Sequence, residues 1–127
     1  MPRNAKIFLA LGALACLLGV ALGAFGAHAL KARLSAEMLA LWKTGVEYHF
    51  YHALGLLAIG ILALHFPRTW LLLWSGWLML AGVILFSGSL YALALTGATW
   101  LAMITPFGGV AFIVAWALLL AAVLRAD

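Results

Sequence analysis

Long apolar runs separated by short polar stretches dominate the pattern along the chain. Each run has about 20 residues, the length at which an α-helix crosses the hydrocarbon core of a bilayer. The pattern predicts membrane-spanning helices over 7–28, 45–66 and 70–95, and a fourth that ends near residue 124. These runs nearly exhaust the chain. We therefore predict an all-α membrane protein with a single domain over 1–127, an up-down bundle of four transmembrane helices.

The stretch 29–44, between the first two runs, has a helical pattern of its own. One stripe of this stretch is apolar, and it consists of Leu30, Leu34, Met38, Leu41 and Trp42. Charged and polar residues take most of the remaining positions. The pattern predicts a short amphipathic helix that lies in the membrane interface between the first and second spans. Ser35 has a suitable side chain for its N-cap.

The start of the fourth span allows two interpretations. Thr105 and Pro106 could be the N-cap and first residue of a new helix, an arrangement that proline favours. Alternatively the helix begins near Trp100 and bends at Pro106. We favour the bend, because 101–104 is too apolar for an exposed loop.

Small residues recur at heptad spacing in two of the runs. One series is Gly12, Gly19 and Gly26, and the other is Ser75, Gly82 and Ser89. Small residues on one helix face allow another helix to approach closely, so both series predict helix–helix contacts. The sequence 19–22 also resembles 82–85, and at the same offset His28 aligns with Tyr91. This similarity suggests two related helical hairpins.

Composition narrows the classes of protein that need to be considered. Hydrophobic residues make up 69% of the chain and charged residues 8%, which excludes an ordinary soluble domain. The net charge of +4 comes from seven scattered cations, too few for a nucleic-acid surface. The single cysteine, Cys16, excludes an internal disulfide and a cysteine-based metal cluster.

The charges at the ends of the spans bear on orientation. Arg3 and Lys6 before an apolar run, with an A-x-A cleavage pattern at 27–29 behind it, resemble a signal peptide. We interpret this segment as a true first span. Its basic flank favours cytoplasmic termini, although the two sides of the membrane hardly differ in their number of positive charges.

Polar residues from all four predicted spans gather in one leaflet, on the side of the 29–44 connection. The candidate ligand-binding residues are His28, Glu47, Tyr48, His52, Ser87, Ser89, Tyr91 and Thr105. Ionisable residues within a membrane usually face the bundle interior and mark function. Glu47 would then seek His28, His49, His52 or Lys43 as its partner. Alternatively, Glu47 and Tyr48 lie at headgroup depth, where the glutamate is solvated.

Three functional hypotheses follow from this cluster. The favoured one is a non-enzymatic accessory protein or a module that binds a lipid or small ligand, and no cofactor is expected. An enzyme has the least support, because no nucleophile–base pair or paired carboxylates are visible. The second is a haem or metal-binding redox protein that uses His28, His49 and His52. The third is a proton-coupled transporter that acts as an oligomer, with Glu47 and His52 as the relay. The bilayer and other membrane subunits, including a second copy of the chain, are the expected partners, and nucleic acid is not.

Four motifs, found at 23–28, 44–48 with His52, 86–91 and 105–109, resemble the YgdD-like family of small membrane proteins. The resemblance covers essentially the whole chain, in order. It implies a bacterial inner-membrane protein with four spans. It implies no activity and no catalytic residues, because this is a family of unknown function. His49 lies outside the family pattern.

Overall fold

A computed structural model describes residues 1–67 and 69–126, and this part of the chain is almost entirely helical. Two charges that flank the predicted spans, Arg68 and Asp127, lie outside the described residues. Four helical segments are long and apolar enough to cross a membrane. The elements are α1 (Arg3–Phe25), η1 (Gly26–Leu30), α2 (Ala36–His65), α3 (Trp70–Gly82), η2 (Val83–Ser87), α4 (Gly88–Thr96), η3 (Thr99–Met103) and α5 (Thr105–Leu124).

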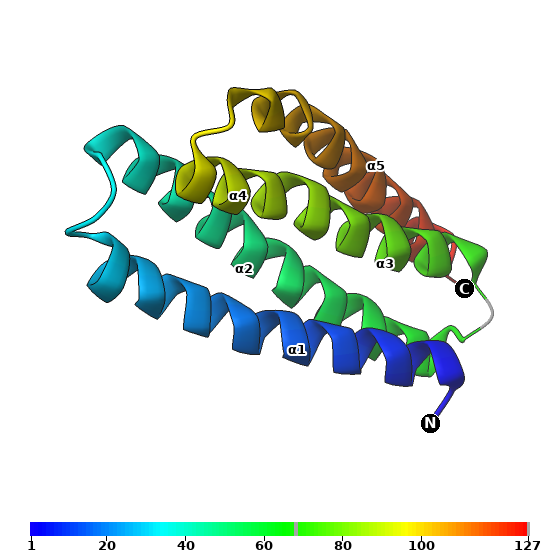
Figure 1. Ribbon diagram of the computed structural model, residues 1–127. Helices are drawn as coiled ribbons and strands as arrows, with labels where there is room; N and C mark the ends of the chain where they lie inside the picture. Colours follow the sequence, from blue (N-terminus) through cyan, green and yellow to red (C-terminus); the bar gives the residue numbers. More distant parts are fainter. Residues whose placement is uncertain (68, 127) are drawn as a thin grey trace.

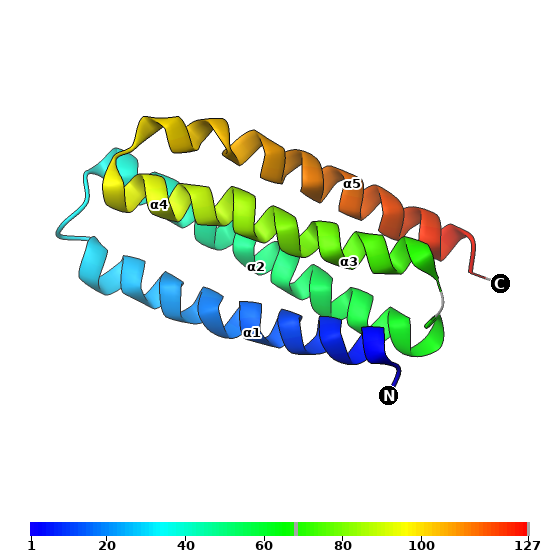
Figure 2. The ribbon, with the colours of Figure 1, turned by 45° about the vertical axis from the view of Figure 1, so that its right-hand side comes forward.

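The four spans run alternately in opposite directions, as predicted (Figure 1). Both termini lie at the same end of the bundle (Figure 2). α1 packs along α2, and α3 packs along α5, while α2 also contacts α3 and α4. The result is a bundle in which α1 and α5 form opposite edges, with α2 and the α3–α4 span between them.

The predicted interfacial helix is not a separate element, and this prediction was wrong. The amphipathic segment forms the first turns of α2, which runs without a break from Ala36 to His65. Ser35 is the N-cap, and its Oγ accepts from the backbone N–H of Met38 at 3.2 Å. The apolar stripe meets protein rather than the membrane surface. Trp42 is 2% exposed, and its Nε1–H donates to the carbonyl of Leu22 at 3.0 Å.

The fourth span is helical from Thr99, near the start of the favoured interpretation, but no α-helix runs through Pro106: α5 begins at Thr105 with the proline in its first turn. The residues before it form the short 3₁₀ helix η3. Proline has no N–H to donate to the carbonyl four residues back, so an α-helix cannot pass through it undisturbed. Ile104 is the N-cap, and no side chain caps the helix. Thr105 instead turns its hydroxyl towards Ser89, at 2.6 Å.

Both heptad series lie at helix contacts, which confirms the prediction. A Cβ on Gly12 would lie 2.9 Å from the side chain of Leu57, and one on Gly19 would lie 3.0 Å from the ring of Phe50. In the second series, Ser75 Oγ donates to the carbonyl of Ala115 at 2.7 Å. The small residues let α1 approach α2, and α3 approach α5, more closely than larger side chains would allow.

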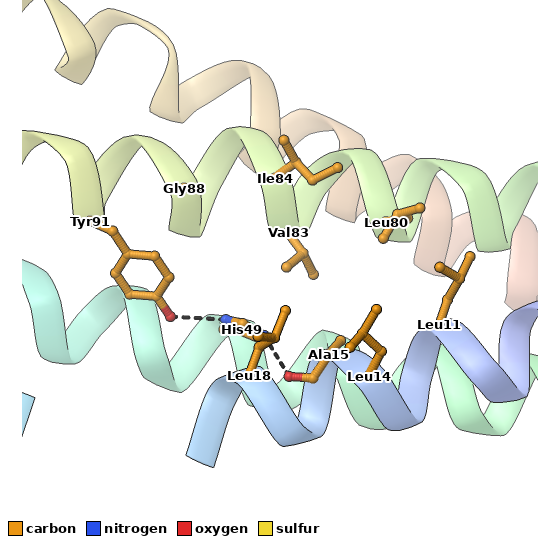
Figure 3. Close-up of a pocket in the computed structure, with 10 residues that line it drawn as sticks. All are labelled: Leu11, Leu14, Ala15, Leu18, His49, Leu80, Val83, Ile84, Gly88 and Tyr91. Atoms are coloured by element: carbon orange, nitrogen blue, oxygen red, sulfur yellow. Dashed lines mark hydrogen bonds between the residues drawn. The ribbon is translucent and has the colours of Figure 1, made fainter. Parts of the chain in front are cut away.

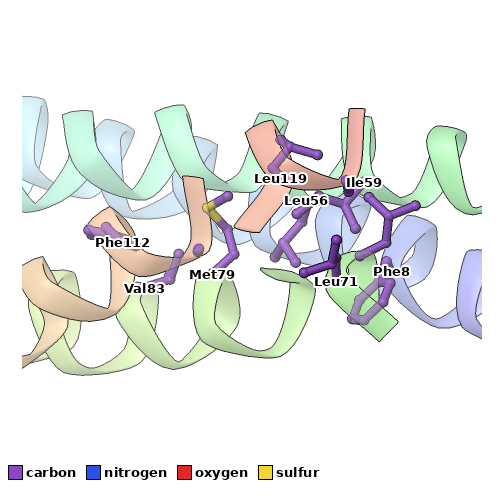
Figure 4. Close-up of a cluster of buried hydrophobic side chains, with 11 residues drawn as sticks. Phe8, Leu56, Ile59, Leu71, Met79, Val83, Phe112 and Leu119 are labelled. Carbon is purple, nitrogen blue, oxygen red and sulfur yellow. The ribbon is translucent and has the colours of Figure 1, made fainter. Parts of the chain in front are cut away.

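An apolar cluster fills the part of the bundle nearer the termini (Figure 4). Its buried members are Phe8, Leu56, Ile59, Leu71, Leu72, Met79, Val83, Phe112, Ala115, Leu119 and Ala122. All four spans contribute to it. Phe8 also makes an edge contact with Trp77 (ring centroids 5.6 Å apart), which joins α1 to α3 at this end.

The third span contains a π-helical turn, η2, between α3 and α4. Such a turn accommodates one extra residue in a helix and changes the direction in which the following side chains point. α3 turns its small residues Ser75 and Gly82 to α5, and α4 turns Leu90 and Tyr91 to Gly45 of α2. Single π turns are frequent at functional sites, and η2 borders the groove described next.

Candidate functional site

A groove with a volume of about 370 Å³ lies between α1 and the α3–α4 span (Figure 3). Its lining residues are Leu11, Leu14, Ala15, Leu18, His49, Leu80, Val83, Ile84, Gly88 and Tyr91. The sides are aliphatic, and α2 contributes His49. The groove therefore combines an apolar surface with one polar pair, His49 and Tyr91, as ligand sites commonly do.

His49 connects three spans through its ring nitrogens. Its Nε2 lies 2.7 Å from the carbonyl oxygen of Ala15 on α1, and its Nδ1 lies 2.9 Å from the hydroxyl of Tyr91 on α4. A carbonyl oxygen only accepts, so Nε2 carries the hydrogen and donates to Ala15. In the neutral ring Nδ1 is then the acceptor, and Tyr91 donates its hydroxyl hydrogen to it. Both ring nitrogens are thus satisfied within the protein.

This pattern leaves one acceptor available in the groove. The Tyr91 oxygen uses its hydrogen on His49 and keeps its lone pairs. The ring is held in place by Trp42, whose ring centroid is 4.6 Å away. Gly45 provides the space for it, because a Cβ there would lie 2.9 Å from the tyrosine ring. The groove therefore presents a fixed phenol oxygen that can accept a hydrogen bond from a ligand.

His52 lies in different surroundings, although it is only one turn from His49. Its Nδ1–H donates to the carbonyl of Tyr48 at 2.6 Å, and its ring stacks on Phe112 with centroids 3.4 Å apart. Tyr48 packs on Phe86 and is 39% exposed. The structure therefore places His52 and Tyr48 in an aromatic contact among α2, η2 and α5, outside the residues that line the groove.

The hydroxyl groups among the candidates join helices to one another. Ser87 Oγ donates to the carbonyl of Gly45 at 2.7 Å and so connects η2 to α2. Ser89 Oγ donates to the carbonyl of Phe86 at 2.9 Å and lies 2.6 Å from Thr105 Oγ1. Ser87 and Ser89 are buried. Of the eight predicted ligand-binding residues, only Tyr91 lines the groove, together with His49 from the predicted metal candidates.

Glu47 and His28 are exposed at the outside of the bundle. Glu47 lies on the rim of a smaller hollow of about 200 Å³ between the first span and α2, together with Lys43, Trp42 and residues of α1 and η1. His49 and His52 make their hydrogen bonds elsewhere. The convergence of the polar residues into one cluster is therefore not observed. His49 and Tyr91 lie in the groove, His52 and Tyr48 lie among aromatic rings, the serines form hydrogen bonds between segments, and Glu47 lies at the rim of the smaller hollow.

The three histidines predicted as haem or metal ligands, His28, His49 and His52, do not come together. Across residues 1–67 and 69–126, no group of three His, Cys, Asp or Glu side chains is placed to hold a metal ion. His49 has both nitrogens engaged, His52 is stacked on Phe112, and His28 is exposed.

Sequence reasoning underestimated His49, which was predicted only as a haem or metal ligand and as a possible partner of Glu47. A usable signal was present one turn to either side of it. Gly45, His49 and Ala53 recur at a spacing of four, and all three are buried. Small residues flanking a histidine on one helix face mark the side on which neighbouring helices approach closely.

Comparison with known proteins places this architecture in a family. The chain is 48% identical to the UPF0382 membrane protein YwdK of Bacillus subtilis over 120 residues, which cover 94% of this chain and 98% of the relative. It is 49% identical to a UPF0382 membrane protein of Staphylococcus saprophyticus over 114 residues, which cover 90% of this chain and 93% of the relative. No solved structure matches it.

A family model described as "Protein of unknown function (DUF423)" matches residues 22–109. This match covers the end of α1, all of α2, the α3–α4 span and the start of α5, and so includes His49, Gly88 and Tyr91. The resemblance to a family of small membrane proteins without an assigned activity is confirmed at this level. The chain belongs to the DUF423 family and, like its UPF0382 relatives, is a small membrane protein of unknown function.

Proposed function

We propose that this protein is a non-enzymatic module that binds an acyl chain of a membrane lipid in the groove between α1 and the α3–α4 span. The observation that carries the proposal is the composition of the groove: aliphatic sides and one hydrogen-bonded pair, His49 and Tyr91. The volume of about 370 Å³ is within the range of small-ligand sites.

The surroundings of the groove favour a lipid as its occupant. Leu14, Leu18 and Ile84 line it and are 52%, 44% and 61% exposed, so a chain can enter sideways from the bilayer. Tyr91 is five residues before the end of α4, or about 7.5 Å along the axis. That depth suits the border between headgroups and hydrocarbon. A hydroxyl or amide of the headgroup region would donate to the Tyr91 oxygen, while the acyl chain runs along Gly88 towards Leu80.

The other hypotheses receive less support from the same residues. A proton relay needs Glu47 and His52 close together, yet residues five apart on a helix point about 140° away from each other. A haem or metal site needs a free imidazole nitrogen, and both nitrogens of His49 are already hydrogen-bonded.

Gly88 allows the proposal to be tested without disturbing the packing. It lines the groove, and a Cβ built on it meets nothing within 4 Å. Gly88→Leu therefore fills the groove. Gly109→Leu is the matched control, because it lies outside the groove and its nearest contact would be 3.9 Å away. Both proteins are reconstituted in vesicles of phosphatidylethanolamine and phosphatidylglycerol that contain a phospholipid with a photoreactive acyl chain.

We expect the wild-type protein and Gly109→Leu to be labelled mainly at the groove residues, and Gly88→Leu to lose most of this labelling. The peptides carrying the label are located by mass spectrometry. Labelling spread evenly over the exposed faces of all four spans, or unchanged labelling in Gly88→Leu, would overturn the proposal.

The same proposal includes a bacterial inner-membrane location with both termini in the cytoplasm. Support comes from Arg3 and Lys6 before the first span and from bacterial relatives named as membrane proteins. The end of the bundle with the 31–35 connection then faces outwards. A C-terminal alkaline phosphatase fusion would be inactive and a C-terminal green fluorescent protein fusion bright; the reverse result would invert the orientation.

A further inference from the structure

The two hairpins of the chain repeat the same internal contacts. In α1–α2, Gly19 packs against Phe50, and in the second hairpin Gly82 packs against Phe112. The next contact along each hairpin corresponds as well. Gly23 faces Val46, and at the same offsets Phe86 faces Gly108, with the small residue now on the other helix. The repeat suggested by the sequence is therefore a repeat of helix pairing.

The first hairpin uses a second face of α2 to receive the second hairpin. Gly45 of this face packs against the ring of Tyr91, and its carbonyl accepts from Ser87. Further along, a Cβ on Gly55 would lie 3.2 Å from Cε of Met79. This interface between α2 and the α3–α4 span holds the two hairpins together.

The corresponding face of α5 has no protein partner among the described residues. Phe50 of α2 corresponds to Phe112 of α5. At the same sequence offset, the α2 residues Gly45, Tyr48 and Gly55 correspond to the α5 residues Phe107, Val110 and Ala117. Phe107 is 70% exposed and Val110 is 59% exposed. The face of α5 that corresponds to the hairpin-binding face of α2 is therefore exposed.

α1 carries the complementary uncovered face. The offset that relates Gly19 to Gly82 relates Val20 to Val83 and Ala24 to Ser87. Val83 is 8% exposed and Ser87 is fully buried, because they meet other helices. Val20 is 63% exposed, and Ala24 is exposed as well. The two uncovered faces lie on α1 and α5, at opposite edges of the bundle (Figure 2).

We propose that α5 of one copy receives α1 of a second copy, and so repeats between chains the interface that joins the two hairpins within a chain. The contact is head-to-tail, since each chain contributes a different face. Such interfaces form a ring if their rotation closes and a filament if it does not. The α1 face involved differs from the one that lines the groove, because Val20 and Ala24 do not line it. The proposal is therefore independent of lipid binding.

The native cysteine provides a direct test. Within the chain, Met79 packs on Gly55. At the offsets given above, Cys16 of α1 corresponds to Met79, and Ala117 of α5 corresponds to Gly55. In the Ala117→Cys variant the new thiol then lies opposite Cys16 of the neighbouring copy. The full chain is oxidised in its membranes and separated by non-reducing electrophoresis. Leu120→Cys is the matched control: it is 61% exposed on the same helix, and its counterpart Ala58 is exposed outside the α2 interface.

We expect Ala117→Cys to give several-fold more crosslinked dimer than Leu120→Cys. Adding Cys16→Ser should abolish the product. Co-expression of a tagged Cys16→Ser/Ala117→Cys chain with an untagged wild-type chain should restore a dimer that contains one of each. Equal crosslinking of Ala117→Cys and Leu120→Cys, or product that persists in Cys16→Ser/Ala117→Cys, would overturn the proposal.

Discussion

The two ends of the bundle are held together by different means. Near the termini, buried apolar side chains are most numerous and interlock, among them Phe8, Ile59 and Leu119. Close glycine contacts occur at both ends of the bundle. At the opposite end, fewer apolar residues are buried, and His49 and Trp42 form hydrogen bonds between spans. The groove lies between these two regions.

This difference shows how a membrane bundle can be stable without a hydrophobic driving force between its helices. Lipid tails are as apolar as leucine, so burial of leucine gains little, and close packing must supply the attraction at the end near the termini. At the other end, directional bonds fix which residues face each other. A groove can persist between them because each end holds α1 in place separately.

The largest expected effect comes from disturbing the close packing near the termini. In Gly60→Leu, the Cβ alone would lie 2.9 Å from the backbone nitrogen of Leu9, which cannot move without shifting α1. We expect a loss of about 3 kcal/mol in the free energy of unfolding, measured by titration with sodium dodecyl sulfate in mixed micelles. Gly88→Leu is the control and should unfold like the wild type. Similar losses in both variants would mean that close packing is not what distinguishes this end.

An intermediate effect is expected at the other end from His49→Leu. The substitution removes the bonds to Ala15 and Tyr91, and interhelical hydrogen bonds within membranes contribute roughly 0.6–1 kcal/mol each. We expect a loss of roughly 1–2 kcal/mol in the same titration, again by that principle. Tyr91→Phe, which removes one of the two bonds, should lose less. A loss in His49→Leu as large as that in Gly60→Leu would contradict the contrast between the two ends.

The smallest expected loss of stability comes from removing one serine-to-carbonyl hydrogen bond at each end, which compares the two ends directly. Ser75 near the termini and Ser87 nearer the opposite end each donate to a helix carbonyl at 2.7 Å, and both are fully buried. We expect Ser75→Ala and Ser87→Ala to lose similar free energies of unfolding, about 0.6 kcal/mol each. A clear difference between these two losses would show that single bonds, and not only packing, distinguish the two ends.

The spans and their small-residue contacts could be predicted because they depend on local pattern. Length and apolarity identify a span, and a heptad of small residues identifies the face that another helix approaches. Ser35 was predictable for the same reason, since a cap acts within one turn. These features need no knowledge of what lies across the bundle.

The site could not be predicted to the same extent, because it depends on which faces meet. Glu47 and His52 are close in sequence, but the partners of α2 place Glu47 at the outer rim and His52 against Phe112. The shift in direction at η2 arises from a hydrogen-bond pattern that no residue type specifies. The start of α2 was missed because an amphipathic stripe looks the same against a membrane surface as against protein.

The turn between the last two spans has a consequence for how the chain enters the membrane. Only Gly97, in the left-handed region with φ of 70°, and Ala98 separate α4 from η3, and Thr96 caps this turn by accepting from the N–H of Ala98. A linker of two residues without charge gives the insertion machinery no signal for the last span. We therefore expect the last span to enter together with α4 as one hairpin during synthesis, with Arg125 behind it as the nearest described charge that can orient the pair.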